Sequence, residues 1–110
     1  MTTNQALLNQ VAEECLEVAQ RISKANRFGL EESQLAGCDT PHGTNRDRIH
    51  QELVDLYAAI EMCVDKGLLR SDVLFVAPAC EGRARAAMKA KKAKIEKYLA
   101  YSRQQGMVRD

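Results

Sequence analysis

Two long stretches of the chain repeat apolar residues at intervals of three and four, and this spacing limits the fold more than any other feature of the sequence. The first stretch predicts a helix over residues 3–27 that ends at Gly29. Its apolar stripe is Leu8, Val11, Cys15, Val18, Ile22 and Ala25. The second stretch predicts a helix from Thr44 or Asn45 to Asp65, and its apolar residues surround most of the helix, which is typical of burial on several sides.

The rest of the sequence predicts further helices and no strands. A last helix is expected over 79–103, with a run of lysines, and a shorter one over 71–77 is ended by Pro78. Residues 30–35 are expected to form another short helix. We therefore predict an all-α fold, a bundle of four to five helices in a single domain spanning 1–110. Because so small a core leaves apolar surface uncovered, the bundle is expected to form oligomers through its helix faces.

Composition excludes several classes of function. The formal net charge is +1, and three tyrosines, two phenylalanines and no tryptophan leave few rings for stacking on bases, so nucleic-acid binding is not expected. No apolar run approaches the roughly 20 residues that a membrane helix needs. The first five residues lack the basic and apolar regions of a signal peptide. These features predict a soluble cytoplasmic protein without membrane association.

The four cysteines are scattered and form no Cys-x-x-Cys pair, so a zinc or thioredoxin-type site is not indicated. Cys15 and Cys63 fall on the apolar faces of their predicted helices, where small buried thiols are expected. Cys38 lies in a polar stretch and is the cysteine expected to be exposed.

Two acidic pairs provide the strongest indication of function. Glu14 with Glu17, and Glu52 with Asp55, are each three residues apart and therefore share a helix face. If the two pairs face each other, they form an all-oxygen pocket of the kind that hard divalent cations prefer. Glu52 and Asp55 lie on the mostly apolar second helix, so partial burial is expected, and a bound cation is the simplest compensation for its cost.

Together the acidic clusters resemble the signature of the MazG-like nucleotide pyrophosphohydrolases, part of the all-α NTP pyrophosphatase superfamily. That signature is Glu-Glu-x-x-Glu followed by Glu-x-x-Asp, and it matches Glu13-Glu14-x-x-Glu17 and Glu52-x-x-Asp55. The basic tail from Lys91 is also similar to the last helix of small family members. The gap between the two motifs is longer here than is usual in the family.

The resemblance implies a magnesium-dependent enzyme that hydrolyses nucleoside triphosphates to the monophosphate and pyrophosphate, with nucleotide-pool clean-up as the expected role. It implies a homodimer or homotetramer, and Mg²⁺, or Mn²⁺ in its place, as the cofactor. The metal ligands it implies are Glu14, Glu17, Glu52 and Asp55. The catalytic residue expected to orient or deprotonate the attacking water is Glu13 or Glu14, and the sequence does not decide between them.

Several basic residues are candidates for binding the substrate phosphates. On the first predicted helix they are Lys24 and Arg27, which could equally balance the helix dipole, and on the second Arg48, which could instead pair with Glu52. On the last helix, Lys91, Lys94 and Tyr98 share a face and could hold the pyrophosphate end, or simply form a solvated surface. Residues 28–45 are interpreted as a lid or substrate loop.

Two alternatives stay open. The first is a related enzyme acting on dUTP or on a phosphoribosyl-ATP-type substrate. The second is a helical interaction module without enzymatic activity, whose basic last helix contacts an acidic partner or nucleic acid.

Overall fold

The computed structural model describes residues 1–33, 43–73 and 83–110, and this part of the chain is entirely helical. Its elements are α1 (Thr3–Phe28), α2 (Asn45–Asp65), the short 3-10 helix η1 (Ser71–Val73) and α3 (Arg83–Gln104). The chain divides into two compact units, Met1–Arg70 and Ser71–Asp110. The all-α prediction is confirmed, but the described residues contain three α-helices rather than four to five.

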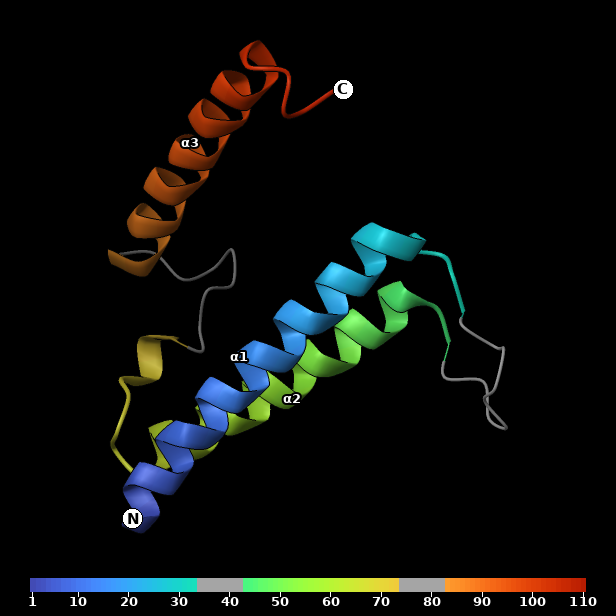
Figure 1. Ribbon diagram of the computed structural model, residues 1–110. Coiled ribbons are helices and arrows are strands. Elements are labelled where there is room, and N and C mark those ends of the chain that lie inside the picture. The colour runs from blue at the N-terminus through green and yellow to red at the C-terminus, as the bar shows by residue number, and fades with distance from the viewer. Residues whose placement is uncertain (34–42, 74–82) are drawn as a thin grey trace. The chain divides into compact units, whose positions relative to one another are not determined.

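The first unit is a pair of antiparallel helices, α1 and α2, that lie side by side along most of their length (Figure 1). Helix α1 begins at a capping box, in which the Thr2 side chain accepts from the backbone of Gln5 and the Gln5 side chain accepts from the backbone of Thr2. It ends at Gly29, whose φ of 100° is unfavourable for residues with a side chain. The predicted helix end is therefore confirmed.

Helix α2 starts at a second capping box, formed by Thr44 and Asp47. The buried Asn45 ties this start to the end of α1, because its Nδ2 donates to the carbonyl oxygen of Gly29 at 2.8 Å. Backbone hydrogen bonds from Asn45 to Glu32 and from Arg46 to Leu30 hold the same corner. The segment 30–33 forms a turn and not the predicted short helix, since these residues pair with the start of α2 instead of with one another.

The interface between the two helices runs along a stripe that differs from the predicted one. Val11, Val18 and Ala25 are shielded as expected. Between them, however, the less exposed positions of α1 are Glu14 and Arg21, while the neighbouring apolar residues Leu8, Cys15 and Ile22 are exposed. The helix thus turns polar residues toward its partner at two of its inner positions.

This arrangement overturns two expectations about burial. Cys63 is fully buried, as predicted, but Cys15 is exposed because it lies one position beside the inner stripe. Helix α2 is not buried on several sides, because α1 covers only one of its faces; Tyr57 and Met62 are each 55% exposed. The buried apolar side chains of the described residues are small, namely Ala25, Ala59 and Cys63. Cys38 lies outside the described residues, as do most of the predicted loop 28–45 and the segment 74–82.

In the second unit, α3 ends in a short tail that folds back on its last turn. The carbonyl oxygen of Ser102 accepts from the backbone N–H groups of Met107 and Val108 at 2.9 and 3.3 Å, and Ser102 itself is buried. Arg103 Nε donates to the backbone oxygen of Asp110 at 2.7 Å. None of the described helices combines the length and the apolar character that crossing a membrane requires.

Candidate functional site

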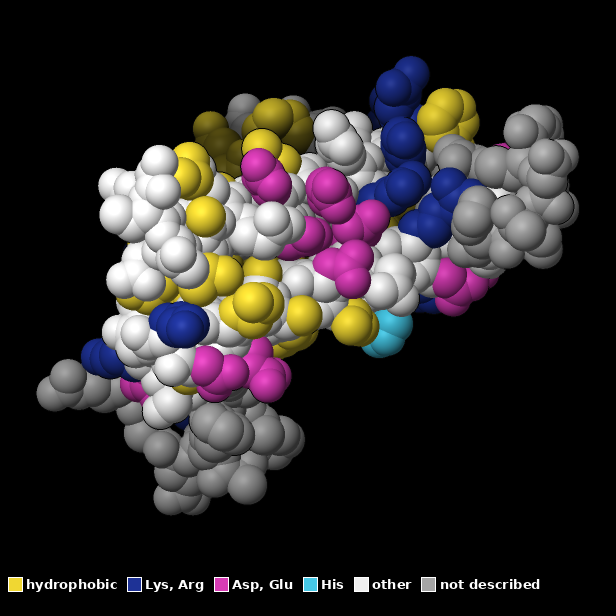
Figure 2. Space-filling view, turned by 90° about the horizontal axis from the view of Figure 1, so that it is seen from below, with side chains coloured by type: hydrophobic (Ala, Val, Ile, Leu, Met, Phe, Trp, Pro, Cys, Tyr) yellow, Lys and Arg dark blue, Asp and Glu magenta, His cyan; other side chains and the backbone are white. Residues whose placement is uncertain are grey.

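Three carboxylates from two helices meet in the first unit. One oxygen from each of Glu14, Glu17 and Glu52 lies within 4.8 Å of the other two. Glu14 and Glu17 share a face of α1, and Glu52 reaches them from α2. In the space-filling view, acidic side chains gather on one face of the molecule with Lys and Arg side chains beside them (Figure 2). The predicted convergence of acids from two separate helices is thus present for three of the four proposed ligands.

Two of these carboxylates have an oxygen that is shielded from water without a hydrogen-bond donor. The atoms are Oε2 of Glu14 and Oε2 of Glu52, which are buried and have no hydrogen-bond partner among the described residues. The other oxygen of Glu14 accepts from Gln10 Nε2 at 2.9 Å. A carboxylate oxygen that loses water without gaining a donor is energetically unfavourable, so both atoms have an unfilled capacity to bind a cation or a donor.

The close packing of like charges changes the protonation of the cluster. The Glu52 carboxyl, close enough to share a proton with Glu17, raises the pKa of Glu17 above its ordinary 4.5, and the negative charges of Glu14 and Glu52 raise this pKa further. Asp55 contributes a smaller effect in the same direction. In the absence of a cation, Glu17 therefore holds its proton more tightly than an isolated glutamate does.

One arginine offsets part of this negative charge. Arg21 lies one turn beyond Glu17 on α1, and its Nε is 3.6 Å from Oε1 of Glu52 on α2. The two side chains are 30% and 15% exposed, so the pair is partly shielded from solvent. It links the helices at the level of the carboxylates.

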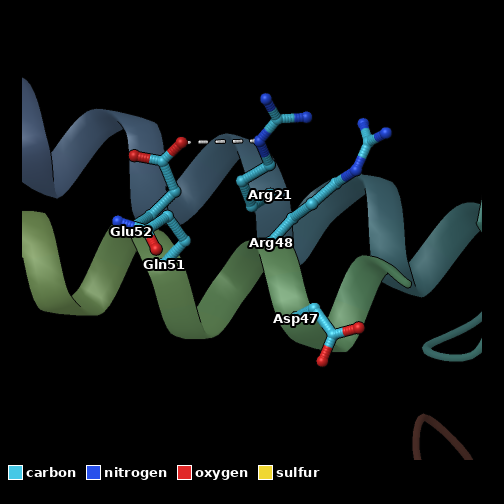
Figure 3. A pocket seen from close by; sticks show the side chains of 5 residues that line it. All are labelled: Arg21, Asp47, Arg48, Gln51 and Glu52. Atoms are coloured by element: carbon cyan, nitrogen blue, oxygen red, sulfur yellow. Dashed lines mark ion pairs between the residues drawn. The ribbon is translucent and has the colours of Figure 1, made fainter. Parts of the chain in front are cut away.

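A cavity of about 390 Å³ opens beside this ion pair. It is lined by Arg21, Asp47, Arg48, Gln51 and Glu52. Figure 3 shows that Arg21 from α1 and Arg48 from α2 extend their guanidinium groups toward the same side of the helix pair, while Asp47 points away from them. Asp47 is engaged in capping α2, where its Oδ2 accepts from the backbone N–H of Thr44 at 3.0 Å. Glu52 belongs to both the cavity and the carboxylate cluster, so the two features adjoin.

The remaining acidic candidates lie at the edge of the cluster or outside it. Asp55 is partly exposed, is not one of the three carboxylates that converge, and accepts from Gln51 Nε2 at 3.0 Å. Its charge still reaches Glu17, so it lies near the cluster. Glu13 is exposed on α1 and is not among the converging carboxylates.

The basic candidates separate into two groups. Lys24 and Arg27 are exposed near the end of α1, where the Arg27 guanidinium lies 5.3 Å from the centre of the Phe28 ring. Neither lines the cavity, whereas Arg48 does. Lys91, Lys94 and Tyr98 line a different cavity of about 440 Å³ in the second unit, together with Ile95 and Leu99. That these three share a face of the last helix is therefore confirmed.

Sequence reasoning did not identify Arg21 as a site residue. It was interpreted only as the partner of Glu17, four residues earlier. A signal was present, because Arg21 follows Glu14 by seven residues and so belongs to the same face as the first acidic motif. What was missing was the knowledge that this face, rather than the apolar one beside it, is turned toward α2.

Comparison of the chain with protein-family models, with curated proteins and with solved structures gave no match.

Proposed function

We propose that the chain is a magnesium-dependent nucleoside triphosphate pyrophosphohydrolase of the MazG-like type. The observation that carries the proposal is the meeting of Glu14, Glu17 and Glu52 from two helices, with two of their oxygens buried and lacking a hydrogen-bond donor. An all-oxygen set of this kind suits a hard dication such as Mg²⁺, with Mn²⁺ as a substitute. The order and spacing of the acidic residues support the same proposal.

In this proposal the dication is held by Glu14, Glu17 and Glu52, and Asp55 completes the set from its position one turn beyond Glu52. When bound, the ion neutralises charge on the substrate phosphates and on the leaving pyrophosphate. The fit is supported by the raised pKa of Glu17, because a group of carboxylates that repel one another gains most from a positive charge placed among them.

The reaction itself is the addition of water to the α-phosphorus of the triphosphate. The new bond joins the water oxygen to that phosphorus, the bond to the bridging oxygen breaks, and pyrophosphate leaves with the bridging oxygen. A proton from the water passes to Glu13 or Glu14. Glu13 is the exposed and unengaged member of this pair, while Glu14 belongs to the converging group, so the two residues are proposed to divide the roles of base and ligand.

The experiment that tests the proposal measures pyrophosphate release from the common ribo- and deoxyribonucleoside triphosphates, with magnesium and with a chelator. We expect release in magnesium only, and its loss in Glu52→Gln by at least about 100-fold. The matched control is Glu61→Gln, which removes an exposed carboxylate of the same helix outside the cluster. Absence of hydrolysis for every nucleotide, including dUTP and phosphoribosyl-ATP, or full activity of Glu52→Gln, contradicts the proposal.

The exposed apolar residues support a further part of the proposal, assembly into a homodimer or homotetramer. Leu16 is 66% exposed, and Tyr57 and Met62 are each 55% exposed. A second copy that covers these faces would bury the apolar surface that a two-helix unit leaves open. Sedimentation at micromolar concentration tests this, and a purely monomeric chain would contradict it.

A further inference from the structure

The cavity beside the carboxylates combines two guanidinium groups with an edge of the proposed metal site. We propose that it is a phosphate subsite, in which Arg21 and Arg48 hold the phosphate chain of the substrate, and that Arg21 leaves Glu52 to do so. The inference rests on the proposed function for the identity of the substrate, but not for the anion-binding property itself.

The first argument is geometric. Arg21 comes from α1 and Arg48 from α2, yet both guanidinium groups extend to the same side of the helix pair (Figure 3). A guanidinium group presents a planar fork of N–H donors that matches two oxygens of one phosphate. A cavity of about 390 Å³ is large enough for a diphosphate group and open enough for it to enter from solvent.

The second argument concerns charge. The lining contains two cations, Arg21 and Arg48, and two anions, Asp47 and Glu52. Asp47 is directed away and is held as the cap of α2; its hydrogen bonds with Thr44 lower its pKa, so it stays ionised in that role. Glu52 is a proposed ligand of the dication. Once its charge is satisfied there, the cavity has an excess of positive charge, and this excess favours an anion.

The third argument is the geometry of the Arg21–Glu52 pair. At 3.6 Å the contact is an ion pair but too long for a good hydrogen bond. Arg21 is 30% exposed, so it can turn toward a ligand without leaving a sealed interior. A cation held loosely against a metal ligand is well placed to move to a phosphate when the metal takes up that ligand.

The test uses inorganic pyrophosphate as the probe, followed by calorimetry in a chelator and again in magnesium. We expect Arg21→Gln and Arg48→Gln each to weaken binding about tenfold, and Arg21→Lys to recover only part of the loss because lysine lacks the fork. The matched control is Arg46→Gln, which removes a guanidinium two residues from Arg48 that pairs instead with Glu31 at 2.6 Å. Melting curves establish that each variant is folded, and Arg48→Gln carries the test if Arg21→Gln is not.

A second measurement separates a phosphate ligand from a residue that merely positions Glu52. If Arg21 competes with the dication for Glu52, Arg21→Gln should bind Mn²⁺, measured by electron paramagnetic resonance, at least as tightly as the wild type. Weaker Mn²⁺ binding together with unchanged pyrophosphate binding would overturn the inference, as would equal losses of pyrophosphate binding in Arg46→Gln and Arg21→Gln.

The outcomes for the subsite and for the proposed function can be told apart. Hydrolysis with unchanged KM in both arginine variants refutes the subsite and leaves the function standing. If no nucleotide is hydrolysed but pyrophosphate binding depends on Arg21 and Arg48, the function is refuted and the subsite stands.

Discussion

The Nε atom of Arg21 on α1 lies 3.6 Å from Oε1 of Glu52 on α2, so a single cation bridges the helices where three carboxylates meet. The two-helix unit therefore carries its charged residues inside its interface, at positions that apolar side chains occupy in an ordinary helical hairpin. The predictions below test what this placement costs and what it provides.

The first prediction concerns pH. Below pH 4.5, Glu17 is protonated in both the folded and the unfolded chain; as pH rises, the unfolded chain releases this proton first, because the pKa of Glu17 is raised only in the fold. Folding stability from this group is thus lost as pH rises through the raised pKa. In a chelator at neutral pH, Glu17→Gln should therefore melt at a higher temperature than the wild type. Equal melting temperatures from pH 4 to pH 8 would contradict this prediction.

The second prediction concerns divalent cations. Magnesium should raise the melting temperature of the wild-type chain, with the shift growing with concentration, because only the folded state brings the ligands together. Glu52→Gln should abolish this shift, and Asp55→Asn should reduce it less, because Asp55 is not among the converging carboxylates. A chelator should reverse the effect. If Asp55→Asn proves as damaging as Glu52→Gln, all four acids of the sequence motif act as one set.

The third prediction concerns Asn45, which is 1% exposed and donates to the carbonyl oxygen of Gly29. Asn45→Ala removes this link and should destabilise the fold by about 1–3 kcal/mol. Asn26→Ala, at an exposed position on α1, is the control and should have little effect. Chemical denaturation measures both, and a difference below about 0.5 kcal/mol between the two would show that the corner is held by its backbone hydrogen bonds alone.

The fourth prediction concerns Gly43, which has a φ of 76°. A Cβ atom there would lie 2.5 Å from Oδ2 of the capping Asp47, so Gly43→Ala should combine backbone strain with a clash, and destabilise by about 1–3 kcal/mol. Gly67→Ala provides the matched control, because Gly67 has a φ of 74° but open space around its Cβ position. The loss at Gly43 should exceed the loss at Gly67, and the reverse order would argue against the clash.

Local features of the fold could be predicted from the sequence because they depend on neighbouring residues. The start of α2 follows from Thr44 and Asp47, and the end of α1 follows from Gly29. The inner face of α1 could not be predicted in the same way. Apolar periodicity favours the side of Leu8 and Cys15, whereas the observed interface contains Glu14 and Arg21. Which of two adjacent stripes meets a partner depends on the partner, and that information is not local.

The candidate site shows the same limit. The pairing of Glu14 with Glu17 on one face required only their spacing, and its meeting with Glu52 required only that two helices face each other. The contribution of Arg21 required the rotation of α1 about its axis, which periodicity alone assigned to the neighbouring face. The helices were also expected to be covered on several sides, and a two-helix unit offers only one partner for each.

The corner at Gly29, Thr44 and Asn45 has a consequence for how the chain can vary. The position of Glu52 along α2 is counted from a cap that is built from 43–47 and fastened to 29–32. Residues added or removed between these anchors leave the alignment of the two acidic motifs unaltered. The chain therefore contains a place where length can drift, or a foreign peptide be grafted, while the spacing between opposing carboxylates is inherited intact.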